Sequence, residues 1–228
     1  MRPFALSECS RQLQSTYPPS ANVTEFIRSA PPPEVRHFLE LWVAEGIPYA
    51  FRHRPMLWQT ARAYLAEQID IDARELTIIG SARIGYSMSP TADFGRVFHP
   101  RSDLDFTAVS SQLFGRIAAD AESWSADYRT GVVQPSEAEK GYWIENAQRL
   151  PDNLARGFVD THYVPNRSRY IWPSRVAQGL WRVMKKLTET EGPQWQRRNS
   201  LRVYRDWETF IRQLVTNTMR LGKRGIAR

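Results

Sequence analysis

Cysteine and long apolar runs are nearly absent from this chain of 228 residues. Cys9 is the single cysteine, so one chain can form neither a disulfide framework nor a cysteine-based zinc site. No run of about 18 uncharged apolar residues occurs, which argues against a transmembrane helix. The N-terminal residues also lack the apolar core of a secretory signal. We therefore expect a cytoplasmic protein that does not span a membrane.

Lysine is also scarce. Only four of the 31 basic residues are lysine and the rest are arginine; against 24 acidic residues they give a net charge of +7. The planar guanidinium group binds phosphate with two hydrogen bonds, so this balance suits a polyanionic partner such as a nucleotide or RNA. An arginine-rich surface without such a partner fits the composition equally well, so charge alone does not decide between them.

The overall composition is that of an ordinary globular protein, with 42% apolar and 24% charged residues and no internal repeat. Helix-type apolar spacing prevails toward both ends, and strand-type runs lie in the middle. We expect an α+β fold in which a short mixed sheet is flanked by helices. The expected parts are a helical segment at 1–70, a core at 71–170 and a helical segment at 171–228, together forming one compact unit.

Individual elements follow from the same periodicities. Helices are predicted at 34–45, 55–68, 110–128, 136–150, 174–188 and 204–221, the fourth from a capping box at Ser136 and Glu139 and the others from apolar residues at helical spacing. Alternation or short apolar runs predict strands at 76–79, 103–109 and 158–164. Pro151 is expected to end the fourth of these helices. Residues 189–200 are expected to form a polar connection.

Two stretches carry the chemistry. The first, residues 76–79, is a short apolar run followed by Gly80 and Ser81, which allow a sharp turn with exposed backbone N–H groups. In the second, residues 103–109, Asp103 and Asp105 alternate with apolar residues and therefore share one face of a strand.

Two carboxylates so close together repel each other, and a cation between them relieves the repulsion. Oxygen ligands favour Mg²⁺, which keeps several waters and completes its coordination with substrate phosphates. A phosphate-binding turn beside a carboxylate pair is typical of nucleotidyl transfer with two metal ions.

Gly80-Ser81 followed by Asp103-Leu104-Asp105-Phe106 resembles the signature of the polymerase-β-type nucleotidyltransferase superfamily. That signature is an apolar residue, Gly, Gly or Ser, a spacer, and then Asp-apolar-Asp/Glu-apolar. The match covers roughly a seventh of the chain. The resemblance implies that Asp103 and Asp105 bind two Mg²⁺ ions and that Gly80 and Ser81 contact the phosphates of a nucleoside triphosphate.

The spacer of this chain, residues 82–102, is longer than is usual in the superfamily. Its part at 88–101 contains several turn signals. We expect this insert to lie beside the active site because both its ends do. An acceptor-binding loop, a lid and a plain surface elaboration are all compatible with its sequence.

The superfamily usually has a third carboxylate on a later strand beside the Asp-x-Asp strand. By that resemblance Asp160, within the run 158–164, is the candidate for a third metal ligand. A loop aspartate that caps a turn is the alternative. Arg83 and Lys185 are candidates for binding the triphosphate. The alternatives are an idle arginine on a helix surface and a lysine that complements a helix dipole.

The resemblance implies transfer of a nucleoside monophosphate from a triphosphate to a hydroxyl group, with release of pyrophosphate. RNA 3′ ends, proteins and nucleotides are all candidate acceptors, and toxin–antitoxin or phage-defence systems with a partner protein are a common context for the superfamily. Two alternatives stay open. One is a catalytically silent, antitoxin-like regulatory partner, and the other is a basic RNA-binding protein.

Overall fold

A four-stranded mixed sheet forms the centre of the molecule. The computed structural model describes residues 6–89, 94–195 and 197–224, with side chains as far as residue 220. The strand order is β1-β2-β4-β3; β2 and β4 are parallel, and the other two pairs are antiparallel. The strands are β1 (Leu76–Ile79), β2 (Leu104–Val109), β3 (Phe158–Asp160) and β4 (Asn199–Tyr204).

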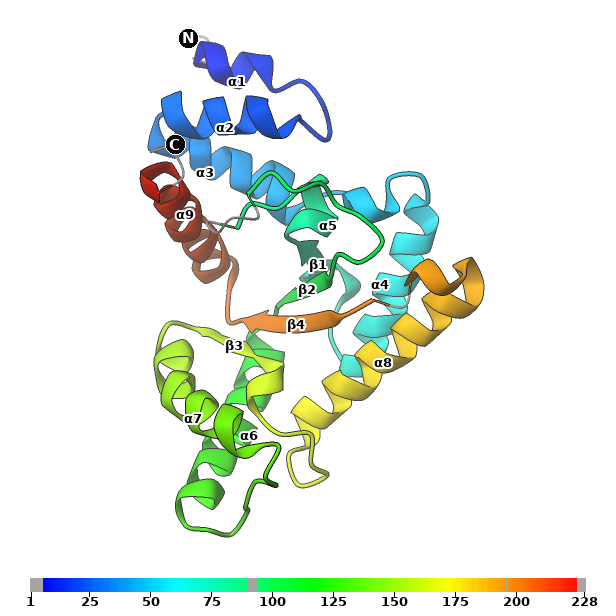
Figure 1. Cartoon of the computed structure of the whole chain (residues 1–228), viewed down its shortest axis with the longest axis vertical. Coiled ribbons are helices and arrows are strands. Elements are labelled where there is room, and N and C mark those ends of the chain that lie inside the picture. The colour runs from blue at the N-terminus through cyan, green and yellow to red at the C-terminus, as the bar shows by residue number, and fades with distance from the viewer. Residues whose placement is uncertain (1–5, 90–93, 196, 225–228) are drawn as a thin grey trace.

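Helices surround this sheet, and the fold is α+β as the sequence predicts (Figure 1). They are α1 (Glu8–Gln12), α2 (Ser20–Ser29), α3 (Pro32–Phe38), α4 (Pro55–Ile69), α5 (Ser81–Ile84), α6 (Ser111–Arg129), α7 (Lys140–Ala155), α8 (Ile171–Glu191) and α9 (Trp207–Arg224). Short helical turns are η1 (Leu39–Ala44), η2 (Tyr49–Phe51), η3 (Ala73–Glu75), η4 (Thr161–Tyr163) and η5 (Pro193–Trp195). In the described part of the chain, none of the helices has the length and apolar character needed to cross a bilayer.

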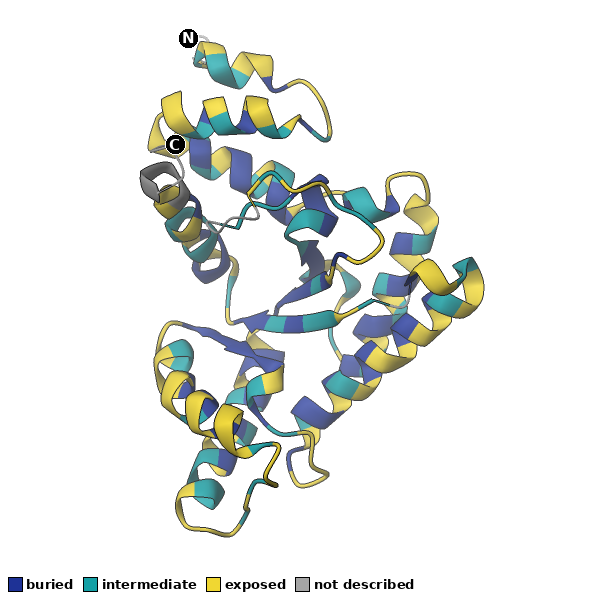
Figure 2. Cartoon of the chain, viewed as in Figure 1, coloured by how far each residue is buried: buried dark blue, intermediate teal, exposed yellow. Residues whose placement is uncertain are grey.

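One face of the sheet is apolar and fully covered. Because successive strand residues point to opposite faces, Leu104, Phe106 and Ala108 of β2 share this face with Leu201 and Val203 of β4. All five are buried in one core cluster to which α4, α6 and α8 contribute. Figure 2 shows the result, with buried residues on the strands and exposed ones on the outer sides of these helices.

The other face is polar and only partly covered. On it Asp105 and Thr107 of β2 lie beside Ser200 and Arg202 of β4. Apolar residues of α9 pack against this face in a small cluster that includes Phe210, Val109, Phe158 and Tyr204, with Ile79 and Leu214 at its partly buried margin. At the end that carries Asp105 the cover is incomplete, Asp105 is only half-buried, and there the candidate site lies.

The expectations about residues 189–200 and about Pro151 are wrong. The polar connection at 189–200 ends in β4, which is a central strand, so the sheet also draws on the segment 171–228 that was expected to be helical. Pro151 lies inside α7 instead of ending it. Leu150 and Leu154, on either side of Pro151, pack against the core, and this tertiary packing outweighs the local preference.

Candidate active site

The chain order of the strands brings the two motif stretches to the same end of the sheet. Because β1 is antiparallel to β2, the C-terminal end of β1 lies beside the N-terminal end of β2, and Ile79 pairs with Asp105. Because β4 is parallel to β2, its N-terminal end also lies there, and Ser200 pairs with Asp105. The turn after β1 therefore meets the acidic strand.

Gly80 makes that turn in a conformation that favours glycine. Its φ is +71° and its ψ is −153°, and Ser81 immediately begins α5. A Cβ atom added at Gly80 would lie 3.5 Å from Asp105 Oδ2. The backbone of the turn thus comes close to the carboxylate, as a shared phosphate and metal site requires.

We expect Gly80→Ala to destabilise the protein by about 1–3 kcal/mol, because this backbone region is strained for any residue with a Cβ. Chemical denaturation measures the change. Gly115→Ala is the matched control: Gly115 lies in α6 with open space around it, so alanine should be neutral or slightly stabilising there. Equal stability of Gly80→Ala and the wild type would contradict the role assigned to this turn.

A cleft of about 520 Å³ opens at this end of the sheet. Gly80, Ser81, Asp103 and Asp105 all line it, so the structure brings the four motif residues together. Its volume is within the range of sites that hold nucleotide-sized ligands. The remaining lining residues come from η1, β1, α5, the rest of the spacer and α9: Leu39, Val43, Ile79, Ile84, Ser87, Met88, Ser89, Arg96, Arg101, Ser102, Leu214, Asn217 and Thr218.

The two aspartates differ in their surroundings. Asp103 is exposed, whereas Asp105 is half-buried and accepts a hydrogen bond of 2.8 Å from Ser200 Oγ. Burial raises the pKa of Asp105, and the negative charges of Asp103 and Asp160 act in the same direction. The Ser200 hydrogen bond and the positive charge of Arg202 oppose the rise. The folded protein therefore disfavours the ionised form of Asp105, and a bound cation would stabilise it.

The raised pKa predicts how stability depends on pH. The folded protein holds the Asp105 proton more tightly than the unfolded chain, so stability falls as pH rises from about 4, the ordinary aspartate pKa, through the raised value. Asp105→Asn can still accept from Ser200 and lacks the titration. Its stability relative to the wild type should therefore increase across this pH window, as measured by denaturant midpoints. A pH-independent difference would contradict the raised pKa.

Asp160 does not lie beside the Asp-x-Asp strand, and that part of the prediction is wrong. It lies on β3, and β4 separates β3 from β2. Both its oxygens accept hydrogen bonds from Arg202, at 2.7 and 2.9 Å. Burial opposes the charge of Arg202, but Asp160 raises the arginine's pKa above its ordinary value. On the side of β4, the residue directly beside Asp105 is Ser200.

Arg83 and Lys185 are not among the residues that line the cleft. The Arg83 side chain is buried; its Nε donates to the Trp42 carbonyl oxygen at 3.0 Å, and burial lowers its pKa to about 10. Lys185 lies on the exposed side of α8, 3.8 Å from a carboxylate oxygen of Glu189 and 5.3 Å from the Trp181 ring centre. Helix α8 covers the opposite, apolar face of the sheet.

The insert lies beside the site, as its ends predicted, in the part that the structure describes; residues 90–93 are outside that part. Tyr86 and Val97 form an antiparallel bridge, and Ser87 N donates to the Arg96 carbonyl oxygen at 2.9 Å. This pairing directs the two ends of the insert into the cleft, where they supply Arg96 and Arg101. Arg96 and Arg101 therefore line the cleft, whereas Arg83 and Lys185 do not.

Sequence reasoning missed the contribution of β4. The signal was present, because Ser200, Arg202 and Tyr204 alternate with Leu201 and Val203 in the way of a half-buried strand. This alternation comes directly after a polar segment that contains Gly and Pro, so it reads as part of a loop. Only its pairing with β2 shows that it is a central strand.

The donor atoms at the cleft fit a magnesium ion that arrives with phosphate. Among the described residues, no group of three or more His, Cys, Asp or Glu side chains could hold a metal alone. Asp103 and Asp105 supply carboxylate oxygens at the cleft. Mg²⁺ is commonly bound by one or two carboxylates together with waters and substrate phosphates, so this small set is sufficient.

Comparisons of the chain with protein-family models, with curated proteins and with solved structures find no match.

Proposed function

We propose that this protein is a Mg²⁺-dependent nucleotidyltransferase that transfers a nucleoside monophosphate from a nucleoside triphosphate to a hydroxyl group and releases pyrophosphate. The observation that carries the proposal is the shared cleft of the Gly80-Ser81 turn and the Asp103/Asp105 pair. The close approach of Gly80 to Asp105 adds to it. A cytoplasmic location, where the triphosphates are abundant, is part of the same proposal.

Each group at the cleft has a role in this reaction. The turn at Gly80 and Ser81 presents backbone N–H groups and a hydroxyl to the phosphates. Arg96 and Arg101 line the cleft and offset the triphosphate charge. Asp103 and Asp105 would hold Mg²⁺, which supplies charge neutralisation and a lower pKa for the attacking hydroxyl. Asp160 is left out of this set because Arg202 occupies both its oxygens.

The proposed reaction is an in-line displacement at the α-phosphorus. A bond forms between the acceptor oxygen and the α-phosphorus, and the bond from the α-phosphorus to the bridging oxygen of the β-phosphate breaks. Pyrophosphate leaves with that oxygen. The acceptor hydroxyl proton passes to solvent, and the Mg²⁺ that Asp103 and Asp105 would hold makes this easier by lowering the pKa of the hydroxyl.

Pyrophosphate release tests the proposal. The full chain is incubated with Mg²⁺ and each of the four ribonucleoside triphosphates, with and without cellular RNA, and labelled products are separated. We expect release with at least one triphosphate, and a labelled acceptor. Absence of release with all four, in both conditions, would favour the two non-catalytic alternatives.

A further inference from the structure

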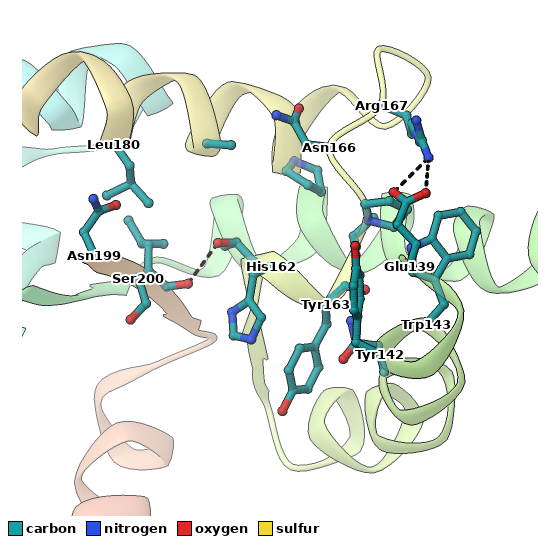
Figure 3. A pocket seen from close by; sticks show the side chains of 17 residues that line it. Glu139, Tyr142, Trp143, His162, Tyr163, Asn166, Arg167, Leu180, Asn199 and Ser200 are labelled. Carbon is teal, nitrogen blue, oxygen red and sulfur yellow. Dashed lines mark hydrogen bonds and ion pairs between the residues drawn. The ribbon is translucent and has the colours of Figure 1, made fainter. Parts of the chain in front are cut away.

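A second cavity of about 460 Å³ lies at the same end of the sheet (Figure 3). It is lined by α7, η4, the loop before α8, α8 itself and the start of β4. Ser200 lines this second cavity and donates a hydrogen bond of 2.8 Å to Asp105, which lines the cleft. The Ser200 hydrogen bond therefore links the lining of the second cavity to the proposed reaction centre across β4.

The lining of the second cavity combines aromatic rings with amide groups. Tyr142 is 50% exposed, and the rings of His162 and Tyr163 meet edge to face with centres 4.8 Å apart. In Figure 3 these two rings lie between Ser200 and the side chains of α7. Asn166 and Asn199 add amide groups that both donate and accept hydrogen bonds. Aromatic faces with amides are the means by which proteins hold unstacked nucleobases.

We propose that the second cavity binds a ribonucleoside that carries the acceptor hydroxyl, with its base among these rings and amides and its ribose directed past Ser200 toward Asp105. The inference rests on the proposed function and names its acceptor class. The ribonucleoside is either the 3′ end of an RNA or a free nucleotide.

Size and charge favour a nucleoside over a protein hydroxyl. A serine or threonine side chain would fill only a small part of about 460 Å³, whereas a nucleoside suits a cavity of this size. Arg167 lies at the second cavity but is already paired with Glu139, whereas Arg198 is exposed directly before Asn199. Arg101 is a further basic side chain, and it lines the cleft. Arg198 and Arg101 offer a path for the phosphates of a nucleic acid.

Photocrosslinking tests the inference without requiring catalysis. The full chain, in EDTA, is irradiated with a short oligoribonucleotide ending in 3′ 4-thiouridine or with 4-thiouridine 5′-monophosphate. We expect adducts in peptides that contain residues 139–146, 161–167 or 199–201. If the oligonucleotide labels the protein at a lower concentration than the mononucleotide does, the acceptor is an RNA end. If the mononucleotide labels it at the lower concentration, the acceptor is a free nucleotide.

Tyr142→Ala removes an exposed ring and should weaken labelling about tenfold, in line with the loss of one stacking partner. Ile144→Ala is the matched control, since Ile144 is 51% exposed on the same helix and is not among the residues that line the second cavity. Its labelling should equal that of the wild type.

Three results would overturn the inference. The first is that adducts lie only in other peptides or form with neither probe. The second is equal labelling of Tyr142→Ala and the wild type. The third is displacement of the probe by a non-hydrolysable triphosphate with Mg²⁺. The third result would mean that the second cavity binds the base of the nucleoside triphosphate instead of the acceptor. Because labelling does not depend on pyrophosphate release, failure of this inference and failure of the proposed function are separable.

Discussion

Replacing Asp103 or Asp105 with alanine should reduce pyrophosphate release by about a thousandfold or more. Each change removes a carboxylate that we propose as a ligand of Mg²⁺, and metal ions stabilise transition-state charge by several kcal/mol, with about 1.4 kcal/mol for each factor of ten. The fold should survive. Burial and the charge of Asp103 already work against ionised Asp105, so Asp105→Ala relieves repulsion in the protein without metal.

Asp152→Ala is the matched control, because Asp152 is an exposed aspartate of α7 that is not among the residues that line the cleft. It should release pyrophosphate at the wild-type rate. Circular dichroism and the melting temperature show whether each variant is folded. Full activity in a folded Asp103→Ala or Asp105→Ala protein would mean that the metal assignment is wrong.

Asp160→Ala should act on stability, with little effect on chemistry. It leaves the Arg202 guanidinium, whose side chain is 33% exposed, without the carboxylate that accepts its two hydrogen bonds. Loss of one partner from a buried ion pair costs about 3–5 kcal/mol, and the partial exposure of Arg202 reduces this to about 2–3 kcal/mol. For a chain of this size the melting temperature should fall by about 5–10 °C.

The double variant Asp160→Ala/Arg202→Met removes the unpaired charge as well and should recover part of the lost stability. Pyrophosphate release by folded Asp160→Ala should stay within a few fold of the wild type. An unchanged melting temperature together with loss of activity as large as that of Asp105→Ala would instead make Asp160 a metal ligand.

The sequence alone predicts the elements whose signals are local. The alternation at 103–109 gives β2, and the apolar run at 76–79 gives β1 with the same bounds. The expected helix at 174–188 lies within α8, and the one at 110–128 nearly coincides with α6, since their apolar stripes are long and regular. The other elements depend on tertiary contacts. The run at 158–164 forms a strand only as far as Asp160, where pairing with β4 ends.

The residues of the candidate site also differ in whether local sequence signals could predict them. Gly80, Ser81, Asp103 and Asp105 could be selected because a turn and an alternating strand fix where their side chains point. Arg83 could not be placed from sequence, because its direction depends on a carbonyl group of the distant residue Trp42. The neighbours of Asp105 likewise depend on the register of β4, which only the three-dimensional pairing reveals.

Thermal unfolding with Mg²⁺ and a nucleoside triphosphate tests most directly whether the Gly80-Ser81 turn and the two aspartates form one binding site. A ligand at about a hundred times its dissociation constant stabilises the folded state by about 2.7 kcal/mol. The melting temperature of the wild type should therefore rise by about 5–10 °C when both components are present, and by less with either alone. The Asp103→Ala/Asp105→Ala double variant should show no such rise. An equal rise in that variant, or none with any of the four triphosphates, would contradict the account.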